Sequence, residues 1–467
     1  GRPQPIRSPM MKRLLASALL AAALTLHAAP PSAEGFTFVK SLAGIDEYRL
    51  DANGLQVLLL PDHSAPVVTL MVTYRVGSRN EVTGTTGATH LLEHLMFKGS
   101  ANYNADKGNK VDQVLDPIGG INNATTSLDR TNYYETFGSE HLATIMPMEA
   151  DRMRNLLLRE SDRQPEMTVV RNEFERGQNN PVQALFQEIS AFAFIAHPYH
   201  HSTIGWRSDI EKVSIEKLRE FYDTFYWPDN ATVTLIGDFQ PADALALIRR
   251  HYGAIPRAPH PIPQVYTEEP EQTGPRRFVI KRPGQLGVVL IGHKTPAGTH
   301  PDYPAVKVLS TILGSGKGSR LYKAITNESL STGVFTMARF TRDPMLHYTF
   351  VPLAPGVAHD KVEPIALAEI EKIKHDGVTD AEVTSAINQI VAETAYARDG
   401  TYAIAAQINE AIAVGDWTLY QTLDEAVAKV TPADVKRVAN LYFNADQSTT
   451  GWFIPITPGA PKAAPAK

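Results

Sequence analysis

The pattern of apolar and polar positions repeats once along the chain, at an offset of 217 residues. An amphipathic stretch of helical period at 213–222 has a hydroxyl residue suited to a helix N-cap at its second position, and the same arrangement returns at 430–439. The first copy is followed by a short apolar run at 233–236 that predicts a strand. Earlier in each half, the apolar runs 67–72 and 287–291 predict a strand leading through a polar loop into a helix. The chain therefore predicts two copies of one structural unit.

Two domains of mixed secondary structure follow from this repeat. Six prolines and many polar residues at 256–275 predict a linker. We expect an N-terminal domain at 36–255 and a C-terminal domain at 276–457, each an antiparallel β-sheet packed with α-helices, which is an α+β fold. The Pro/Ala/Lys-rich residues 458–467 are expected to form a disordered tail.

The N-terminus has the features of a secretory leader. Two basic residues at 12–13 precede an apolar run at 14–26, which is too short to span a membrane, and small residues follow it. We expect residues 1–29 to be a signal peptide and the protein to act in a bacterial periplasm. The chain has no cysteine, so its fold needs no disulfide in an oxidising compartment. No later stretch is long and apolar enough to predict a membrane span.

Charge argues against nucleic acid as a partner. The formal net charge is −5, and removal of residues 1–29, which carry four positive charges and no negative ones, leaves −9. Nucleic-acid-binding proteins need a basic patch or stripe, and none is present here.

The string His90-Leu91-Leu92-Glu93-His94 carries the strongest chemical signal. On a helix, His90 and His94 would project from the same face, as two neutral nitrogen ligands for a catalytic zinc ion with one position left for water. Glu93 lies on the same side, where it could take a proton from a water that the metal activates. The pattern is the inverse of the commoner zinc-protease motif. For the string alone, a buried amphipathic helix whose histidines bond to the backbone is the alternative.

A zinc site of this kind needs a third protein ligand, and a carboxylate is suitable. Glu173 lies in a stretch that predicts a helix starting after Pro165, and Glu166 lies two helical turns before Glu173 on the same face. One of these carboxylates could bind the metal while the other orients a ligand histidine from behind. A solvated helix face is the alternative for these two glutamates.

With these motifs the chain resembles the pitrilysin/insulinase family of zinc peptidases, of the bacterial type with two homologous domains. The matching stretches are 87–99, 119–126, 169–173 and 197–199, in the family's order. The resemblance implies a zinc-dependent endopeptidase that hydrolyses short or unfolded peptides. It assigns these roles: His90, His94 and Glu173 as ligands of one Zn²⁺, Glu93 as catalytic base, and Glu166 as support for a ligand.

The resemblance also implies where peptides bind. The strand expected at 122–126 corresponds to a sheet edge beside the metal, to which an extended substrate adds through main-chain hydrogen bonds. Asn123 and Ala124 are the substrate-binding positions carried over. An ordinary buried strand is the alternative.

One family feature is missing. Active single-chain relatives carry an arginine and, seven residues later, a tyrosine in the second domain, which reach the substrate and the developing oxyanion. In this sequence the arginine position holds Thr326, and the tyrosine falls at Thr332 or Gly333. Threonine has no charged donor fork and a shorter reach. We therefore expect this chain to be the zinc-bearing subunit of a heterodimer whose homologous partner supplies the pair.

Other interpretations remain open at this point. The glycine-rich segment 314–319 resembles a phosphate loop but lacks its first glycine and its Ser/Thr. The histidines at 197, 200 and 201 could bind a metal, although they match a family segment near the substrate. The chain could also be a non-catalytic scaffold or peptide-binding subunit, or a peptidase that removes specific leaders.

Overall fold

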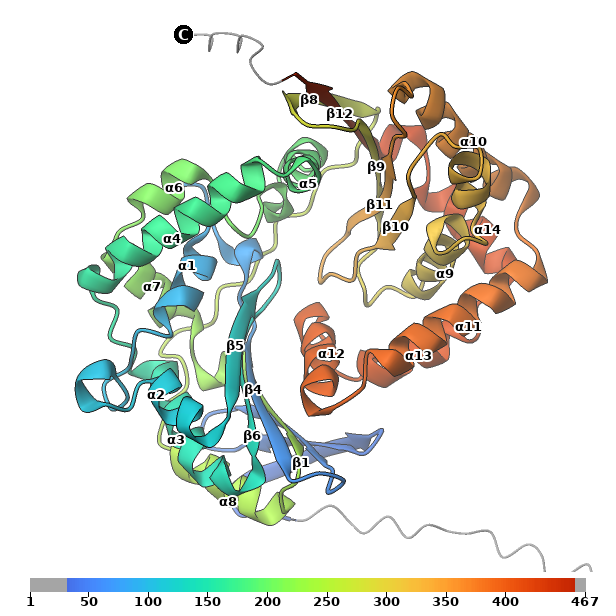
Figure 1. The fold of residues 1–467 in the computed structure, drawn as a ribbon. Helices are drawn as coiled ribbons and strands as arrows, with labels where there is room; N and C mark the ends of the chain where they lie inside the picture. Colours follow the sequence, from blue (N-terminus) through green and yellow to red (C-terminus); the bar gives the residue numbers. More distant parts are fainter. Residues whose placement is uncertain (1–31, 458–467) are drawn as a thin grey trace, which may run out of the picture.

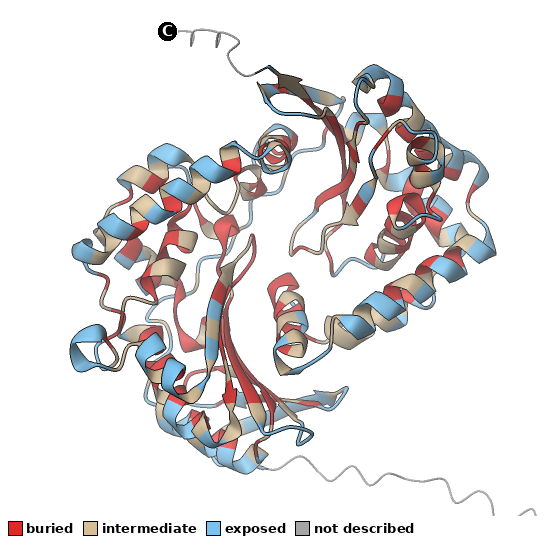
Figure 2. Cartoon of the chain, in the orientation of Figure 1, coloured by how far each residue is buried: buried red, intermediate tan, exposed pale blue. Residues whose placement is uncertain are grey.

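Two β-sheets covered by helices make up residues 32–457, the part of the chain that this computed structural model describes (Figure 1). The expected leader at 1–29 and tail at 458–467 lie outside the described residues. Figure 2 shows buried residues along the strands of both sheets, whereas the outer faces of the helices are exposed. The α+β architecture of two similar halves is confirmed. Within residues 32–457, no helix combines the length and apolar character needed to cross a membrane.

The first sheet has seven strands in the order β1-β2-β3-β7-β4-β6-β5. Its strands are β1 Phe36–Leu42, β2 Ile45–Leu50, β3 Gln56–Pro61, β4 Val67–Tyr74, β5 Ile121–Thr126, β6 Thr131–Gly138 and β7 Ala231–Gly237. The helices of this half are α1 Ala88–Leu95, α2 Val111–Leu115, α3 Leu142–Arg154, α4 Glu160–Gln178, α5 Pro181–Ala193, α6 Arg207–Lys212, α7 Ile215–Phe225 and α8 Pro241–Tyr252.

The second sheet has five strands in the order β10-β11-β9-β12-β8. Its strands are β8 Arg276–Pro283, β9 Val288–Thr295, β10 Phe335–Ala338, β11 Met345–Pro352 and β12 Ser448–Ile456. Its helices are α9 Tyr303–Gly314, α10 His359–Asp376, α11 Asp380–Tyr396, α12 Thr401–Val414, α13 Leu419–Val427 and α14 Pro432–Tyr442. Residues 256–275, between α8 and β8, contain no helix or strand.

The expectation of purely antiparallel sheets is wrong in one respect. β3 pairs with β7 in parallel, and β8 pairs with β12 in parallel, while the other pairings are antiparallel. A parallel pair needs a long crossover connection. Both pairs have one, since nearly the whole helical layer of a domain lies between their two strands in the sequence.

The two halves exchange helices across their interface. From the first half, α5 packs its Leu185 and Ile189 against Leu290 and Leu346 of the second sheet. From the second half, α12 packs on the first sheet, and in Figure 1 it lies between the two halves. Each domain thus covers part of the other's sheet, which joins the two halves through continuous apolar cores.

The expected helices are present, with one difference at a boundary. Ser214 and Thr431 cap α7 and α14 by accepting the main-chain N–H of Lys217 and Asp434 at 3.2 Å each. The helix expected to start after Pro165 instead starts at Glu160. Ion pairs along its first turn, such as Arg163–Glu160 at 2.7 Å, favour helix ahead of the proline, which removes only one main-chain donor.

Candidate metal centre

Helix α1 packs one face into the core and carries His90, Glu93 and His94, so its position decides the geometry of the centre. Leu91, Leu92 and Leu95 lie in the core of the first domain. The N-cap is Gly87 with φ 82°, a left-handed conformation, and a Cβ there would meet the carbonyl oxygen of Ile204 at 2.5 Å. A glycine cannot cap a helix with its side chain. The N-terminal turn is therefore satisfied from elsewhere.

The missing cap comes from Glu81, whose side chain is fully buried. Its two carboxylate oxygens accept the main-chain N–H of Gly87 at 3.0 Å and of Thr89 at 2.8 Å. A negative charge at this end also interacts favourably with the helix dipole. His201 contacts the same carboxylate, with Nε2 3.1 Å from Oε1.

His90, His94 and Glu173 converge on one point. The two imidazole rings are 4.8 Å apart and nearly perpendicular, at 81°. The Nε2 atoms of His90 and His94 lie 3.6 Å and 3.8 Å from the two carboxylate oxygens of Glu173 on α4. Two ligands of a tetrahedral zinc ion stand about 3.4 Å apart. The separations therefore fit a zinc ion between these side chains after a small adjustment.

Burial sets the protonation state of the His90 ring, and a carboxylate contacts the His94 ring. Burial, and secondly the neighbouring His94, lower the pKa of His90 to about 4, so its ring is neutral near pH 7. Nδ1 of His94 lies 3.0 Å from Glu166 Oε2 on α4. With Nδ1 donating to this carboxylate, the lone pair of His94 is on Nε2, the atom that faces Glu173.

Glu166 is itself held in its charged form. Burial alone would raise its pKa, but hydrogen bonds from Lys98 and from His94 outweigh burial and lower it. Lys98 follows α1 closely and contacts the second carboxylate oxygen of Glu166. Lys98, Glu166 and His94 thus form a chain of contacts that ends at Nδ1 of His94, on the side of the ring away from Glu173.

Glu93 lies beside the two histidines, and one ligand atom from each of these three residues falls within 4.8 Å of the others. Burial raises the pKa of its carboxyl group above the usual value. The hydroxyl of Thr126 donates a hydrogen bond to Glu93, which opposes that rise. A carboxylate with a raised pKa, held in place by a donor, can accept and return a proton near neutral pH.

Thr126 is the last residue of β5, which is an edge strand of the first sheet. Asn123 and Ala124 lie on this strand and pair with β6 on one side. The main-chain N–H of Ala124 donates to Oδ1 of Asn123 at 2.9 Å. Through Thr126, the edge strand β5 thus lies next to Glu93.

The structure separates the other candidate groups from this centre. Arg320 makes a two-pronged contact to Glu382, at 2.8 Å and 3.0 Å, and the hydroxyl of Thr326 shares a 2.8 Å hydrogen bond with Ser331. His197 and His201 each face a carboxylate and do not converge on one point. Away from this centre, no other histidine–carboxylate cluster in residues 32–457 has metal-binding spacing.

Comparison with known proteins agrees with this geometry. A family model described as insulinase (peptidase family M16) matches residues 56–206, and one described as peptidase M16 inactive domain matches residues 212–390. The chain is 32% identical to the zinc protease PqqE of Helicobacter pylori, covering 86% of this chain and 91% of that protein. It is 25% identical to a probable mitochondrial-processing peptidase subunit beta of Arabidopsis thaliana, covering 84% and 75%.

Solved structures show the same fold. A protease from Helicobacter pylori superposes with a TM-score of 0.84 at 30% identity, over 89% of this chain and all of that chain. A peptidase M16 inactive domain from Pseudomonas fluorescens superposes with a TM-score of 0.78 at 17% identity, over 89% and 99%. The histidines and glutamates of the centre all lie within the 56–206 match.

Proposed function

This chain belongs to the insulinase family of peptidases (family M16), and from that premise we propose that it is a zinc-dependent endopeptidase of short or unfolded peptides. The observation that carries the proposal is the convergence of His90, His94 and Glu173 beside a partly buried Glu93. The same three residues are proposed as the zinc ligands. The predicted leader supports a periplasmic location.

The chain's own residues divide the chemistry among them. Zinc, when bound, polarises the scissile carbonyl and makes the attacking water more acidic. Glu93 accepts a proton from this water and later delivers it to the leaving amine, while Thr126 keeps its carboxylate in place. Glu166 orients His94 from behind.

Substrate binding is assigned to the open edge of β5. An extended peptide adds to an exposed strand through main-chain hydrogen bonds, which require little of its sequence. Asn123 occupies the N–H of Ala124 in the absence of substrate, so an incoming peptide carbonyl replaces that contact. This arrangement suits unfolded peptides because a folded protein does not present a free extended segment.

The second half of the site is assigned to a homologous partner subunit. Thr326 stands where family members carry the arginine, and Thr332 or Gly333 where they carry the tyrosine. The nearby Arg320 is engaged with Glu382. Loss of one oxyanion donor typically costs on the order of 100-fold or more in rate. A partner that carries the pair restores those donors.

The test is hydrolysis of a quenched peptide library by the zinc-loaded protein, alone and mixed with candidate partner subunits. We expect activity in the mixture and a loss of at least about 100-fold in the Glu93→Gln variant, which keeps zinc because no ligand is changed. Full activity of the chain alone would contradict the partner requirement. Zinc binding without turnover in any mixture would instead support a non-catalytic scaffold or peptide-binding subunit.

A further inference from the structure

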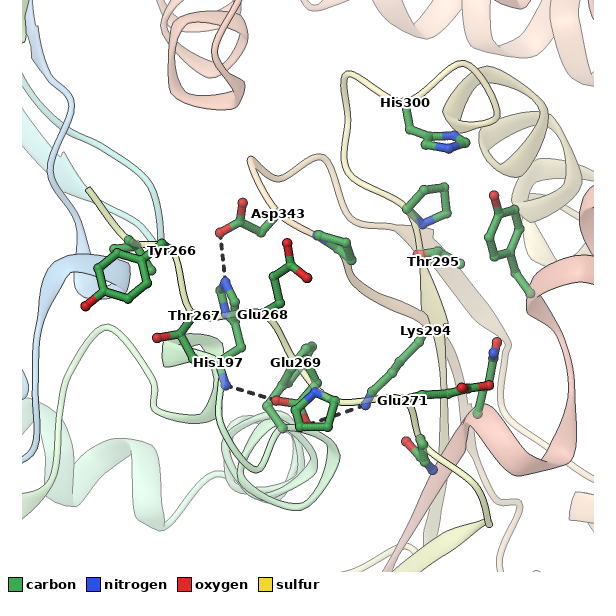
Figure 3. Close-up of a pocket in the computed structure, with 18 residues that line it drawn as sticks. His197, Tyr266, Thr267, Glu268, Glu269, Glu271, Lys294, Thr295, His300 and Asp343 are labelled. Atoms are coloured by element: carbon green, nitrogen blue, oxygen red, sulfur yellow. Dashed lines mark hydrogen bonds and ion pairs between the residues drawn. The ribbon is translucent and has the colours of Figure 1, made fainter.

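A loop of the second domain is clamped between polar side chains of the first. The carboxylate of Asp343 accepts a hydrogen bond from Arg79 Nε at 2.6 Å and contacts His197 Nε2 at 2.7 Å, the second of which is drawn in Figure 3. Burial alone would raise the pKa of Asp343, but the hydrogen bonds from His197 and Arg79 lower it to about 2. The carboxylate therefore stays charged between two donors of the other domain.

A second set of contacts holds the same loop. The main-chain N–H of Asp343 donates to the hydroxyl of Tyr199 at 3.1 Å, and this hydroxyl donates to Asp129 at 2.6 Å. The other oxygen of Asp129 accepts the main-chain N–H of Arg342 at 3.0 Å. Tyr199 and Asp129 are both buried. We call all of these residues the interdomain clasp: Arg79, Asp129, His197, Tyr199, Arg342 and Asp343.

The clasp leads directly to the N-terminus of α1. Glu81, which caps that helix, is two residues after Arg79, and His201, which contacts Glu81, is two residues after Tyr199. Both segments that grip Asp343 therefore continue into the pair that holds the first turn of α1. His90 lies in this first turn, directly after Thr89, which Glu81 contacts.

Two other contacts between the domains are made to strands of the first sheet, away from the N-terminus of α1. Trp417 Nε1 donates to Glu47 on β2 at 2.7 Å, and Thr73 on β4 donates to Asn409 at 2.8 Å. These contacts join α12 and its neighbourhood to strands of the sheet. They provide an internal comparison, because they stabilise the same interface by a different route.

We propose that Asp343, a residue of the second domain, is a positioning residue for the metal helix, acting through the clasp and then through Glu81. This proposal rests on the proposed function, since it takes α1 as the helix that binds zinc. The second domain then contributes to the metal centre, because its loop at Asp343 fixes the position of the first turn of α1. The clasp also borders a cavity of about 590 Å³ between linker residues 265–272 and the second domain, so water can reach this part of the interface (Figure 3).

The experiment is a double-mutant cycle on zinc affinity, measured by competition with a chelator. The variants are Asp343→Asn, Glu81→Gln and their combination, with Trp417→Phe as the matched interdomain control. We expect Asp343→Asn to weaken zinc binding between about 2-fold and 30-fold, the range typical of coupling between distant sites. Trp417→Phe should leave zinc affinity unchanged. In the Glu81→Gln background, Asp343→Asn should have little further effect, because both changes act on one route.

Two further readouts separate positioning from general stability. Asp343→Asn should lower kcat more than it changes KM, because the edge of β5 is untouched, and Asp343→Glu should restore part of the loss. If Glu81→Gln does not fold, His201→Gln replaces it in the cycle. Equal zinc affinities for Asp343→Asn, Trp417→Phe and the unmodified protein would overturn the proposal, as would fully independent effects of Asp343→Asn and Glu81→Gln. A failure of the unmodified protein to bind zinc would instead contradict the proposed function.

Discussion

The same pair of packed helices occurs in both halves of the molecule, but only the first pair carries the histidines and carboxylates of the candidate metal centre. α1 and α4 correspond to α9 and α11, and the repeat offset of 217 places Lys307, Ser310 and Thr311 where the first half has His90, Glu93 and His94. The positions of the two α4 glutamates fall on Val383 and Ile390, which are buried in the second core.

The difference lies in how each pair fills the space between its helices. In the second half, apolar side chains close that space, and Ser310 is used to hold His347 on β11 at 2.9 Å. In the first half, carboxylates and imidazoles occupy it, where Glu166 contacts His94 at 3.0 Å and Thr126 donates a hydrogen bond to Glu93. Buried polar groups are costly unless paired, so the first half needs Glu81, Lys98 and Thr126 where the second needs only packing.

The largest effect is expected from removing a proposed zinc ligand from the first helix pair. His90→Ala removes one of three proposed ligands, and we expect zinc affinity to fall by more than about 100-fold, since changes behind the ligands alone typically cost 10–100-fold. Peptide hydrolysis should be lost with the metal. Metal content after dialysis, measured by elemental analysis, tests this.

The matched control for that variant is Lys307→Met, at the equivalent position of α9. Burial lowers the pKa of Lys307, so its replacement by an apolar side chain of similar length should be tolerated. Zinc content should not change. If Lys307→Met lost zinc as readily as His90→Ala, the division of labour between the two helix pairs would be wrong.

Much of the fold could be predicted from the sequence because it depends on local patterns. The hydroxyl caps before α7 and α14 and the repeated apolar runs are short-range signals, and they indicate the two halves. The parallel pairings β3–β7 and β8–β12 could not be predicted in this way. Whether two strands run in parallel depends on the path of the chain between them and not on the residues of either strand.

The residues of the site likewise fall into those that a local pattern predicts and those that depend on tertiary packing. His90, Glu93 and His94 lie together because one helical turn brings them together. The place of Glu173 and Glu166 opposite them depends on how α4 packs against α1. The helix pattern therefore offered these two residues only as candidates, and their separate roles came from the family resemblance. Sequence reasoning missed a further set of residues whose contacts join distant segments. Thr126 and Lys98 had weak signals, at the end of an expected strand and just beyond the motif, but Glu81 and Asp343 had none.

A smaller effect on zinc affinity is expected from a change at Glu166, which contacts the proposed ligand His94. Glu166→Gln keeps the shape of the side chain but removes the charge that His94 contacts, and it should weaken zinc binding by about 10- to 100-fold without abolishing it. The control is Glu363→Gln in the second half, another buried carboxylate, paired with Arg277 and Trp452. It should change thermal stability but not zinc affinity. An equal loss of zinc in both variants would show that the effect is general and does not pass through His94.

The smallest effect on zinc affinity is expected at Lys98, the outermost residue of the polar group around His94. Lys98 contacts Glu166 but is 37% exposed, and exposed ion pairs contribute little because water screens them. We expect Lys98→Met to weaken zinc binding by no more than about 5-fold, with Lys217→Met on α7, an exposed pair with Glu220, as the control without effect. Chelator competition resolves a change of this size. A loss as large as that of Glu166→Gln would mean that Lys98 is required to keep Glu166 charged, and the polar space of the first helix pair would then extend to the protein surface. An effect below 2-fold would instead mean that the groups that matter for zinc affinity are limited to the histidines and the two glutamates. The second helix pair cannot show this limit, because apolar side chains fill the space between its helices.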